Sequence, residues 1–422
     1  MNSTLMTNSG VMLPRHATAP IEEALSDTRV VLVNGARQSG KSTLARQVAR
    51  RHDAEWRSFD NPQTLVQARF DPLDFVASTQ MIVIDEVQRE PSILLPIKQR
   101  VDEYPKPGSF LLTGSAHVMG LKSVPDALPG RLETIELWPL SQGEIDGTPD
   151  GFVDAVFADP LGLRVSSNLV KADYAERVAR GGFPEAVLRQ GKRRTSFFRN
   201  YVADLVNREV TQVADIQRGP EFRTILQLLA AQSAGLLVPA NLAVATGLSK
   251  TTVSKYLAVM SEVFLTKTLP SWSRGPAGRI TKTPKLAFVD SGVATSLVGQ
   301  DASSLLRPDA PFGQLLEGFV AMELARQTTW SQTEVDMFHY RTKDKQEVDV
   351  VLQDARGRIV GIEVKASSTV HGDDFSGLRH LARRAGDDFL LGIVAYTGAS
   401  TAAFGDRMRA MPISAIWRSP IE

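Results

Sequence analysis

The chain has 422 residues, too many for one hydrophobic core, and about two to three domains are expected. It contains no cysteine, which excludes disulfide bonds, thiolate metal sites and thiol catalysis. The net charge of +1 neither favours nor excludes a nucleic-acid partner, because a basic face would have to be local. The apolar runs are of strand length and residues 1–16 lack the order of a signal peptide, so we expect a cytoplasmic protein without membrane contact.

A glycine-bounded loop near the N-terminus is the first strong motif. Residues 29–33 are mostly apolar and strand-like, GARQSGKS follows at 35–42, and the residues after it have helical spacing. In this order, backbone N–H groups and the helix dipole can hold a phosphate group. We therefore predict an ATP-binding site in which Lys41 reaches the β- and γ-phosphates and the Ser42 hydroxyl ligates Mg²⁺. The predicted nucleotide-binding residues are Gly35, Ala36, Arg37, Gln38, Ser39, Gly40, Lys41, Ser42 and Thr43.

The next apolar segment, residues 81–84, runs directly into two carboxylates. An acid at the end of such a strand holds Mg²⁺ in P-loop enzymes, and this role falls to Asp85. The attacking water needs a carboxylate near the γ-phosphate, which makes Glu86 the expected general base. Acidic strand ends are common in parallel sheets, but the combination with the loop at 35–42 predicts hydrolysis as well as binding.

Two further features follow along the chain. A strand-like segment at 109–112 ends in a Thr-Gly-Ser sequence, which we expect to set the hydroxyl groups of Thr113 and Ser115 beside the γ-phosphate. Arg131 precedes another strand-like run at 132–137 and is far from the loop in sequence. An arginine in this position fits an arginine finger supplied to a neighbouring subunit, and the plainer alternative is a solvated cation at a helix end.

Several sequence segments together resemble a group of prokaryotic AAA-type ATPases with a C-terminal nuclease-like domain. They are GARQSGKS at 35–42, IDEVQ at 84–88, LTGS at 112–115, and GR at 130–131 followed by LWPLS at 137–141. The resemblance implies an α/β P-loop ATPase domain over residues 1–145, a sensor role for Ser115 or Thr113, and an arginine finger at Arg131. It also implies a helical lid and linker over 146–220 and a homo-oligomer formed through the ATPase domains.

The middle region, residues 221–290, has the element order of a winged helix. A helix with one apolar face is followed by a short helix, a glycine turn and a serine-capped helix, which predicts a helix-turn-helix. Two strand-like segments then flank a loop rich in glycine, proline and arginine, as in a wing. The segments are residues 222–229, 239–246, 251–260, 264–269 and 285–289.

This region carries more basic than acidic residues, which favours contact with DNA. We expect the serine-capped helix to contact a groove and the arginine-rich loop to contact phosphates. A winged helix used only for packing or for protein contact is the alternative. The predicted DNA-binding residues are Lys250, Thr251, Thr252, Lys255, Arg274 and Arg279.

The C-terminal region contains a second candidate site. Strand-like segments at 347–352 and 359–365 are expected to form a hairpin, in which alternation sets Glu363 and Lys365 on one face with Asp349 across from them. An Asp followed by Glu-x-Lys on the adjacent strand resembles the core of restriction-endonuclease-like nucleases. In that core the carboxylates hold Mg²⁺ and the lysine positions or activates water.

We therefore expect an α/β restriction-endonuclease-like domain over residues 291–422. Glu317, on a predicted helix, would be a further acid at the metal. We also expect a helix at 371–384 and a closing strand at 413–417. Charged residues are costly to bury one by one, so a shared site explains them better than separate accidents. The same fold is also found without cleavage.

Two readings of the function stay open. In the first, an Mg²⁺-dependent ATPase controls a DNA-associated nuclease. In the second, an ATP-dependent switch or assembly protein uses its C-terminal domain as a non-cleaving module that docks nucleic acid or protein. The presence of Asp349, Glu363 and Lys365 favours the first reading, and the lack of a recognisable substrate signature leaves the second open.

Overall fold

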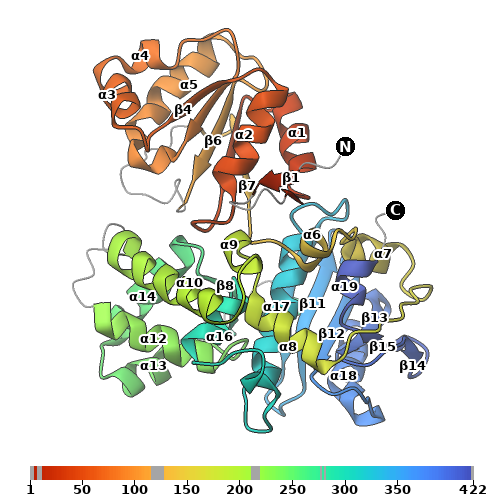
Figure 1. The fold of residues 1–422 in the computed structure, drawn as a ribbon. Helices are drawn as coiled ribbons and strands as arrows, with labels where there is room; N and C mark the ends of the chain where they lie inside the picture. Colours follow the sequence, from red (N-terminus) through yellow and green to blue (C-terminus); the bar gives the residue numbers. More distant parts are fainter. Residues whose placement is uncertain are drawn as a thin grey trace. The chain divides into compact units, whose positions relative to one another are not determined.

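The computed structural model describes residues 4–6, 12–115, 128–210, 219–275, 278–279 and 282–419. The chain forms two compact units, Met1–Leu140 with Val259–Phe264 and Ser141–Ala258 with Leu265–Glu422 (Figure 1). Each unit is built around its own β-sheet.

The first unit contains a parallel five-stranded sheet in the order β4-β5-β6-β3-β7. Its strands are β3 (Val30–Asn34), β4 (Glu55–Ser58), β5 (Ile82–Asp85), β6 (Phe110–Gly114) and β7 (Leu132–Glu136). Strands β3, β5 and β6 are buried along their whole length, as expected for apolar runs in a sheet covered on both faces. Because β6 lies between β3 and β5, the carboxyl ends of these strands meet at one edge.

The helices of the first unit are α1 (Thr18–Asp27), α2 (Lys41–Arg51), α3 (Pro62–Phe70), α4 (Pro72–Phe75) and α5 (Leu94–Glu103). They cover both faces of the sheet (Figure 1). Ile21 of α1 and Val48 of α2 pack with Val33 in one core. Ile97 of α5 packs with Leu32 in the other core. Successive residues of β3 therefore point to opposite faces. A short antiparallel pair, β1 (Thr4–Met6) and β2 (Met12–Pro14), precedes α1.

Helical segments follow Leu140 in the chain, all in the second unit except for the end of one helix, which belongs to the first unit from Val259 onward. They are α6 (Gln142–Asp146), α7 (Phe152–Ala158), α8 (Lys171–Arg180), α9 (Pro184–Val187), α10 (Gly191–Asp204), a π-helical turn at Leu205–Val210, α12 (Gly219–Ala231), α13 (Pro239–Thr246), α14 (Lys250–Glu262) and α16 (Ser291–Leu297). Strands β8 (Thr266–Leu269) and β9 (Lys285–Phe288) form an antiparallel pair. Gly247 ends α13 with a φ of 69°, and the Ser249 hydroxyl accepts a hydrogen bond from the N–H of Thr252 at 3.1 Å. The predicted turn and cap are thus confirmed, while the winged-helix identity stays a prediction.

The sheet of the second unit has the order β10-β11-β12-β13-β15-β14. Its strands are β10 (Val335–Arg341), β11 (Glu347–Asp354), β12 (Ile359–Lys365), β13 (Phe389–Tyr396), β14 (Ala402–Ala403) and β15 (Met408–Pro412). The first three are antiparallel, and β12, β13 and β15 are parallel. Helix α17 (Phe312–Gln327) packs against β9 and β12. Helix α18 (Ser376–Ala385) packs Leu378 and Leu381 against Val348 of β11.

Strand β11 contains a bulge that the sequence did not predict. Phe338 pairs with Val351 and Tyr340 pairs with Val348, so three residue steps on β11 match two on β10. The extra residue interrupts the alternation of side chains, and Asp349 lies inside the interruption. The direction of the Asp349 side chain is therefore set by the bulge and not by simple alternation.

Two predicted C-terminal elements differ from the structure. The helix expected at 371–384 is a 3-10 turn at Gly372–Phe375 followed by α18. The closing strand expected at 413–417 is wrong, because Ala415–Arg418 is a short helix, α19, and β15 ends before it. The apolar residues of this segment, Ile413, Ala415, Ile416 and Trp417, are all buried, and the Trp417 ring packs against Tyr174 and Phe319.

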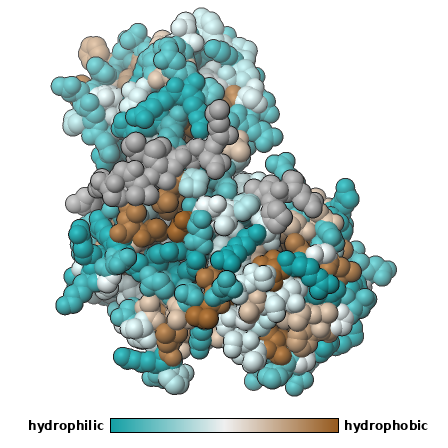
Figure 2. Space-filling model, turned by 45° about the vertical axis from the view of Figure 1, so that its right-hand side comes forward, coloured by the Kyte–Doolittle hydropathy of each residue, from teal (hydrophilic) through white to brown (hydrophobic). Residues whose placement is uncertain are grey.

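No helix in the described part of the chain is long and apolar enough to cross a bilayer. Helix α17 has 16 residues and is buried along most of its surface because it lies inside the second unit. On the face shown in Figure 2, hydrophobic residues form separate small patches among hydrophilic ones.

Candidate nucleotide site and C-terminal charged cluster

The predicted phosphate-binding loop joins β3 to α2 at the carboxyl edge of the first sheet. Gly40, directly before α2, has a φ of 101°, a left-handed conformation that glycine adopts without steric cost. A Cβ atom at Gly35 would lie 2.1 Å from the carbonyl oxygen of Leu137, so glycine is required there as well. The sequence thus forms a tight loop before a helix N-terminus, an arrangement that binds phosphate.

Lys41 is the first residue of α2, and only 4% of its surface is exposed. Its ammonium group donates hydrogen bonds to the backbone carbonyls of Gly35 and Ala36 at 2.9 and 2.8 Å. The positive charge of the motif is therefore held over the loop.

Asp85 ends β5 and is 3% exposed. Its Oδ1 atom accepts hydrogen bonds from the hydroxyl groups of Ser42 and Thr113, each at 2.7 Å. Its Oδ2 atom accepts one from the Ser58 hydroxyl at 3.2 Å. These residues meet because β3, β5 and β6 end at the same edge of the sheet. Mg²⁺ prefers oxygen ligands, so the Ser42 hydroxyl and the Asp85 carboxylate fit this ion.

Glu86 has a φ of 61°, an uncommon conformation for a residue with a side chain. Its N–H donates to the Thr113 hydroxyl at 3.0 Å, and its carboxylate accepts a hydrogen bond from the side-chain amide of Gln88. The same amide donates to the Ser115 hydroxyl at 2.8 Å. Gln88, to which the sequence assigned no role beyond the shared IDEVQ segment, therefore connects the predicted base to the predicted sensor residue. Strained backbone of this kind concentrates at active sites.

Arg15 is a second residue at this site that sequence reasoning missed. Its buried guanidinium donates to the backbone carbonyls of Ser39 in the loop and of Trp138 after β7, each at 2.7 Å. Arg15 thus ties the segment before α1 to the phosphate-binding loop. No local pattern distinguishes it from a surface arginine, because both of its partners are distant in sequence.

Arg131 lies at the opposite edge of the first sheet. It precedes β7, and its carbonyl accepts a hydrogen bond from the N–H of Val30, the first residue of β3, at 3.1 Å. The phosphate-binding loop follows the other end of β3, about 13 Å away along the strand. The guanidinium forms a two-point ion pair with Asp102 and donates to the Pro129 carbonyl at 3.0 Å. The Arg131 guanidinium therefore lies away from the nucleotide site of its own chain, and its role as an arginine finger stays a prediction.

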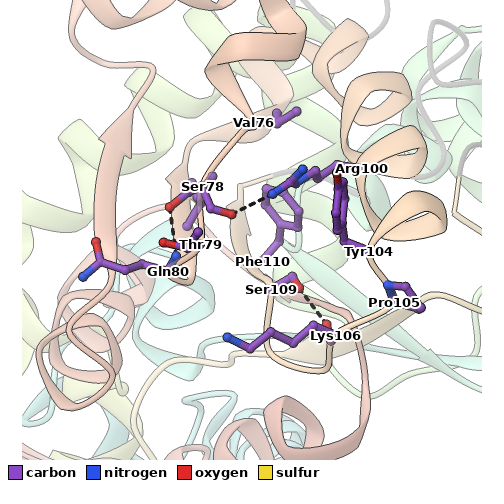
Figure 3. Close-up of a pocket in the computed structure, with 11 residues that line it drawn as sticks. Val76, Ser78, Thr79, Gln80, Arg100, Tyr104, Pro105, Lys106, Ser109 and Phe110 are labelled. Atoms are coloured by element: carbon purple, nitrogen blue, oxygen red, sulfur yellow. Dashed lines mark hydrogen bonds between the residues drawn. The ribbon is translucent and has the colours of Figure 1, made fainter.

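The first unit also contains a pocket between the start of β5, the start of β6 and the end of α5 (Figure 3). Its lining includes Ser78, which precedes β5, and Phe110, the first residue of β6. Arg100 donates to the Ser78 carbonyl at 2.9 Å, and its guanidinium lies 4.0 Å from the centre of the Tyr104 ring. These residues lie at the amino edge of the sheet, so the pocket takes no part in the predicted phosphate chemistry.

The C-terminal site of the second unit is centred on Asp349 of β11, which is 7% exposed. Its Oδ2 atom accepts a hydrogen bond from the N–H of Val364 at 3.0 Å, and its Oδ1 atom accepts one from the Lys285 ammonium at 2.8 Å. Lys285, the first residue of β9, is 4% exposed and also pairs with Glu347 at 2.8 Å. Sequence reasoning missed Lys285 because it precedes the expected nuclease-like domain, whose limit at residue 291 stays a prediction.

The other predicted residues lie near this centre. The Lys365 ammonium donates to Glu363 on the same strand at 2.9 Å, and Glu317 of α17 lines the same small cavity as Lys285 and Asp349. Burial raises the pKa of Glu317 and of Glu363, and the charge of Asp349 raises both pKa values further. Burial alone would lower the pKa of Lys285, but the neighbouring carboxylates, Asp349 first, outweigh it and raise this pKa. The structure therefore gathers the predicted acids and lysine and adds Lys285.

A divalent metal ion does not fit this cluster as it is folded. Lys285 lies against Asp349 and Lys365 against Glu363, so both carboxylates already have a positive partner. Within the ranges described above, no group of three or more His, Asp or Glu side chains is arranged to hold a metal ion. The metal role of Asp349, Glu363 and Glu317 stays a prediction that this arrangement does not favour.

The predicted DNA-binding residues of α14 lie at its N-terminal end. Lys250, Thr251 and Lys255 are exposed, and Thr252 is partly buried and belongs to the Ser249 cap. Thr251 and Lys255 are four residues apart and share one face of the helix. This end of α14 is a small polar surface with two lysines.

The two predicted arginines of the wing loop have other partners. Arg274 donates to the carbonyl of Ala385 at 3.1 Å. Arg279 donates to the side chain of Gln353 at 2.6 Å and lies 4.7 Å from the centre of the Phe338 ring. Both guanidinium groups therefore attach the loop to the C-terminal sheet and its helix, which gives them a structural role and leaves their DNA contact a prediction.

Three family models match successive parts of the chain. The model described as an AAA domain matches residues 27–146. Two domains of unknown function, DUF8612 and DUF4143, match residues 171–304 and 312–416. The AAA match confirms the prediction of an α/β AAA-type ATPase domain in the N-terminal part, whereas the other two matches assign no activity.

Two mycobacterial proteins that are described as uncharacterised are similar to most of the chain. Uncharacterized protein Rv2008c of Mycobacterium tuberculosis and Mb2031c of Mycobacterium bovis are each 27% identical over 358 residues, 84% of this chain and 74% of theirs. The Walker-type ATPase PABY2304 of Pyrococcus abyssi is 14% identical, with a TM-score of 0.43 over 70% of this chain and 98% of that chain. AMPPCP-bound DnaA of Aquifex aeolicus is 14% identical, with a TM-score of 0.30 over 58% of this chain and 86% of that chain.

Proposed function

We propose that this chain binds and hydrolyses ATP in the presence of Mg²⁺. The observation that carries the proposal is the meeting of the loop and the acidic strand end, where the Ser42 hydroxyl donates to the Asp85 carboxylate at 2.7 Å. P-loop enzymes use such a pair to hold Mg²⁺. When bound, this ion supplies the positive charge that neutralises the phosphate oxygens.

The residues of the chain supply the remaining parts. The backbone N–H groups of the loop and the N-terminus of α2 bind the phosphates, and the Lys41 ammonium exchanges its carbonyl partners for phosphate oxygens. Glu86 accepts the proton of the attacking water. The Thr113 hydroxyl contacts both Asp85 and the Glu86 N–H, so it fixes the acid and the base relative to each other. Gln88 orients the Glu86 carboxylate.

The proposal includes a homo-oligomer in which Arg131 acts on the nucleotide of a neighbouring copy. Arg131 and the loop lie at opposite edges of the sheet, so a head-to-tail contact between two copies would bring them together. The guanidinium would then exchange Asp102 for phosphate oxygens of the neighbour. An arginine supplied in this way stabilises the charge that develops during phosphoryl transfer.

DNA is the proposed partner of the middle region. Lys250, Thr251 and Lys255 are exposed at the start of a helix that follows a short helix and a glycine turn. In a helix-turn-helix, the first turns of this second helix enter the major groove. Arg274 and Arg279 are not needed for this proposal, because their guanidinium groups have partners within the second unit.

For the C-terminal domain, we favour the reading in which it docks nucleic acid or protein without cleavage. A metal-dependent nuclease needs carboxylates that are free to hold a divalent ion, and Lys285 already neutralises Asp349 and Glu347. One observation supports the cleaving alternative. Asp349, Glu363 and Lys365 lie close together on adjacent strands, as they would in a nuclease.

One assay separates these readings. The full-length protein is incubated with ATP and Mg²⁺, with and without supercoiled plasmid, and both phosphate release and plasmid integrity are followed. We expect Mg²⁺-dependent hydrolysis that DNA stimulates, with the plasmid left intact. Folded protein that never releases phosphate would refute the ATPase proposal. Plasmid cleavage that Asp349→Ala removes and Lys41→Ala retains would establish the nuclease reading instead.

A salt titration tests the DNA partner. The double variant Lys250→Ala, Lys255→Ala should bind duplex DNA more weakly than the wild type. The slope of log Kd against log salt should fall by up to about 1.8, because each lysine that neutralises a phosphate contributes about 0.9 to this slope. Lys343→Ala, Lys345→Ala is the matched control, since both lysines are exposed on the turn between β10 and β11. Equal affinity and slope in all three proteins would exclude this surface of α14.

A further inference from the structure

Lys285 reaches the C-terminal cluster from the β8–β9 pair. Its ammonium contacts Asp349 and Glu347, each at 2.8 Å, and the side chain is almost completely buried. A lysine side chain has high conformational freedom and a large hydration energy, so burial at this depth requires strong compensation. Contact with two carboxylates provides it.

The backbone around Lys285 is fixed from two directions. Lys285 pairs with Leu269 in the β8–β9 ladder. Two residues earlier, the carbonyl of Thr283 is within hydrogen-bond distance, 3.0 Å, of Nε2 of His339. His339 lies on β10 opposite the bulge that contains Asp349. The start of β9 and the bulge of β11 are thus held next to the same histidine, and the contact between Lys285 and Asp349 is part of the fold.

The cluster brings four acids together with three bases. The acids are Glu317, Glu347, Asp349 and Glu363, and the bases in contact with them are Lys285, Lys365 and Arg341. A divalent ion bound by Asp349 would lie about 2.0 to 2.6 Å from a carboxylate oxygen. The Lys285 ammonium, at 2.8 Å from the same carboxylate, occupies that volume and repels a second cation.

We propose that Lys285 is a resident counter-cation that takes the place of a divalent metal ion in this cluster. Removal of its charge leaves Asp349 and Glu347, the two carboxylates that it contacts, free to bind Mn²⁺ or Mg²⁺. The proposal deepens the non-cleaving reading of the C-terminal domain and does not depend on ATP hydrolysis. The counter-cation proposal and the ATPase proposal can therefore be refuted independently.

The test measures Mn²⁺ binding by nucleotide-free, full-length protein, with free Mn²⁺ followed by electron paramagnetic resonance. Lys285→Met keeps the length of the side chain and removes its charge. It should bind Mn²⁺ at least about tenfold more tightly than the wild type, and Mn²⁺ should raise its Tm but not that of the wild type. Addition of Asp349→Asn to Lys285→Met should return binding to the wild-type level. Binding at the nucleotide site is common to all variants and cancels in the comparison.

Lys267→Met is the matched control, because Lys267 lies on β8 of the same pair, where it is opposite Ala287 and not opposite Lys285. It should bind Mn²⁺ like the wild type. A folded Lys285→Met protein that gains no Mn²⁺ binding would overturn the proposal. If Lys285→Met does not fold, the comparison of wild type with Asp349→Asn still decides. Equal Mn²⁺ binding supports a metal-free cluster, and weaker binding by Asp349→Asn overturns it.

Discussion

The nucleotide site and the C-terminal cluster each contain a buried aspartate in a β-strand, and the two aspartates have different partners. Asp85 accepts hydrogen bonds from the hydroxyl groups of Ser42 and Thr113. Asp349 accepts one from the ammonium of Lys285. A carboxylate held by neutral hydroxyls can bind a cation from solution, whereas a carboxylate held by lysine already has one. Similar acidic residues therefore produce one site that fits Mg²⁺ and one that does not.

The difference also separates function from stability. Hydroxyl donors can reorient toward a ligand at little cost, so the Asp85 carboxylate can exchange its hydroxyl partners for a ligand during turnover. A buried ion pair has no such freedom, because removal of one partner typically costs about 3 to 5 kcal/mol. We therefore expect substitutions at the nucleotide site to change ATP binding and turnover, and substitutions in the C-terminal cluster to change folding and cation binding.

Loss of Lys41 should have the largest effect and would sharpen the comparison at the nucleotide site. Lys41→Ala removes the cation beside the β- and γ-phosphates, so ATP affinity should fall by at least about 100-fold. A titration with a fluorescent ATP analogue measures this. Lys106→Ala is the control, because Lys106 is exposed at the amino edge of the same sheet. Similar affinities in the two variants would refute the role of the loop.

Glu86→Gln tests the base without removing its hydrogen-bonding shape. The amide cannot accept the proton of the attacking water, so kcat should fall about 10²- to 10⁴-fold while ATP binding is retained. Steady-state phosphate release and a binding titration measure the two quantities. Glu103→Gln, at the exposed end of α5, should behave like the wild type. Turnover at the wild-type rate by Glu86→Gln would mean that another group is the base.

Arg131→Ala tests whether the nucleotide site is completed by a second copy. We expect kcat to fall at least about tenfold with little change in ATP binding, because the arginine would stabilise charge formed only during transfer. A mixture of Arg131→Ala with Lys41→Ala should regain part of the activity, since one interface contains an intact pair. Arg29→Ala is the matched control at the same edge, where Arg29 lies 4.0 Å from Asp102. Full activity in a dilute monomer would exclude the arginine finger.

The smallest effect is expected at His339, beside the C-terminal cluster, and it concerns how the free energy of unfolding depends on pH. Burial lowers the pKa of His339 to about 4, and the charge of Lys285 acts in the same direction. In the unfolded chain the pKa is about 6.5, so between these values the unfolded state binds more protons. The free energy of unfolding should therefore fall as the pH drops from 6.5 toward 4, by an amount on the order of 2 kcal/mol.

Urea unfolding at several pH values measures this effect. His339→Gln keeps a hydrogen-bond donor toward the Thr283 carbonyl and should show a flatter pH dependence than the wild type. His371→Gln, at an exposed position, should keep the wild-type slope. The same pH dependence in all three proteins would show that His339 is protonated equally in the folded and unfolded states.

The nucleotide site could be predicted from the sequence because its parts are local. Residues 35–42, Asp85 and Glu86 each follow an apolar strand, and parallel strands bring their carboxyl ends to one edge in any sheet of this kind. The place of each motif in the fold therefore follows from the strand that precedes it. Gln88 lies two residues after Glu86 in the same motif. Its contact with Ser115 could not be predicted from the sequence, because the two residues follow different strands.

The C-terminal cluster depended on the tertiary structure. Asp349, Glu363 and Lys365 were recognisable from their spacing, but the bulge in β11 sets the direction of Asp349. Its cationic partner Lys285 lies 64 residues earlier, on a strand that sequence reasoning assigned to another domain. The strand predicted at residues 413–417 was also wrong, because the short helix Ala415–Arg418 buries Trp417 there. The sequence by itself determined which charged residues the chain contains and on which strand-like segments they lie. Only the fold decided which charges meet, because a buried ion pair is selected by packing between elements far apart in the chain.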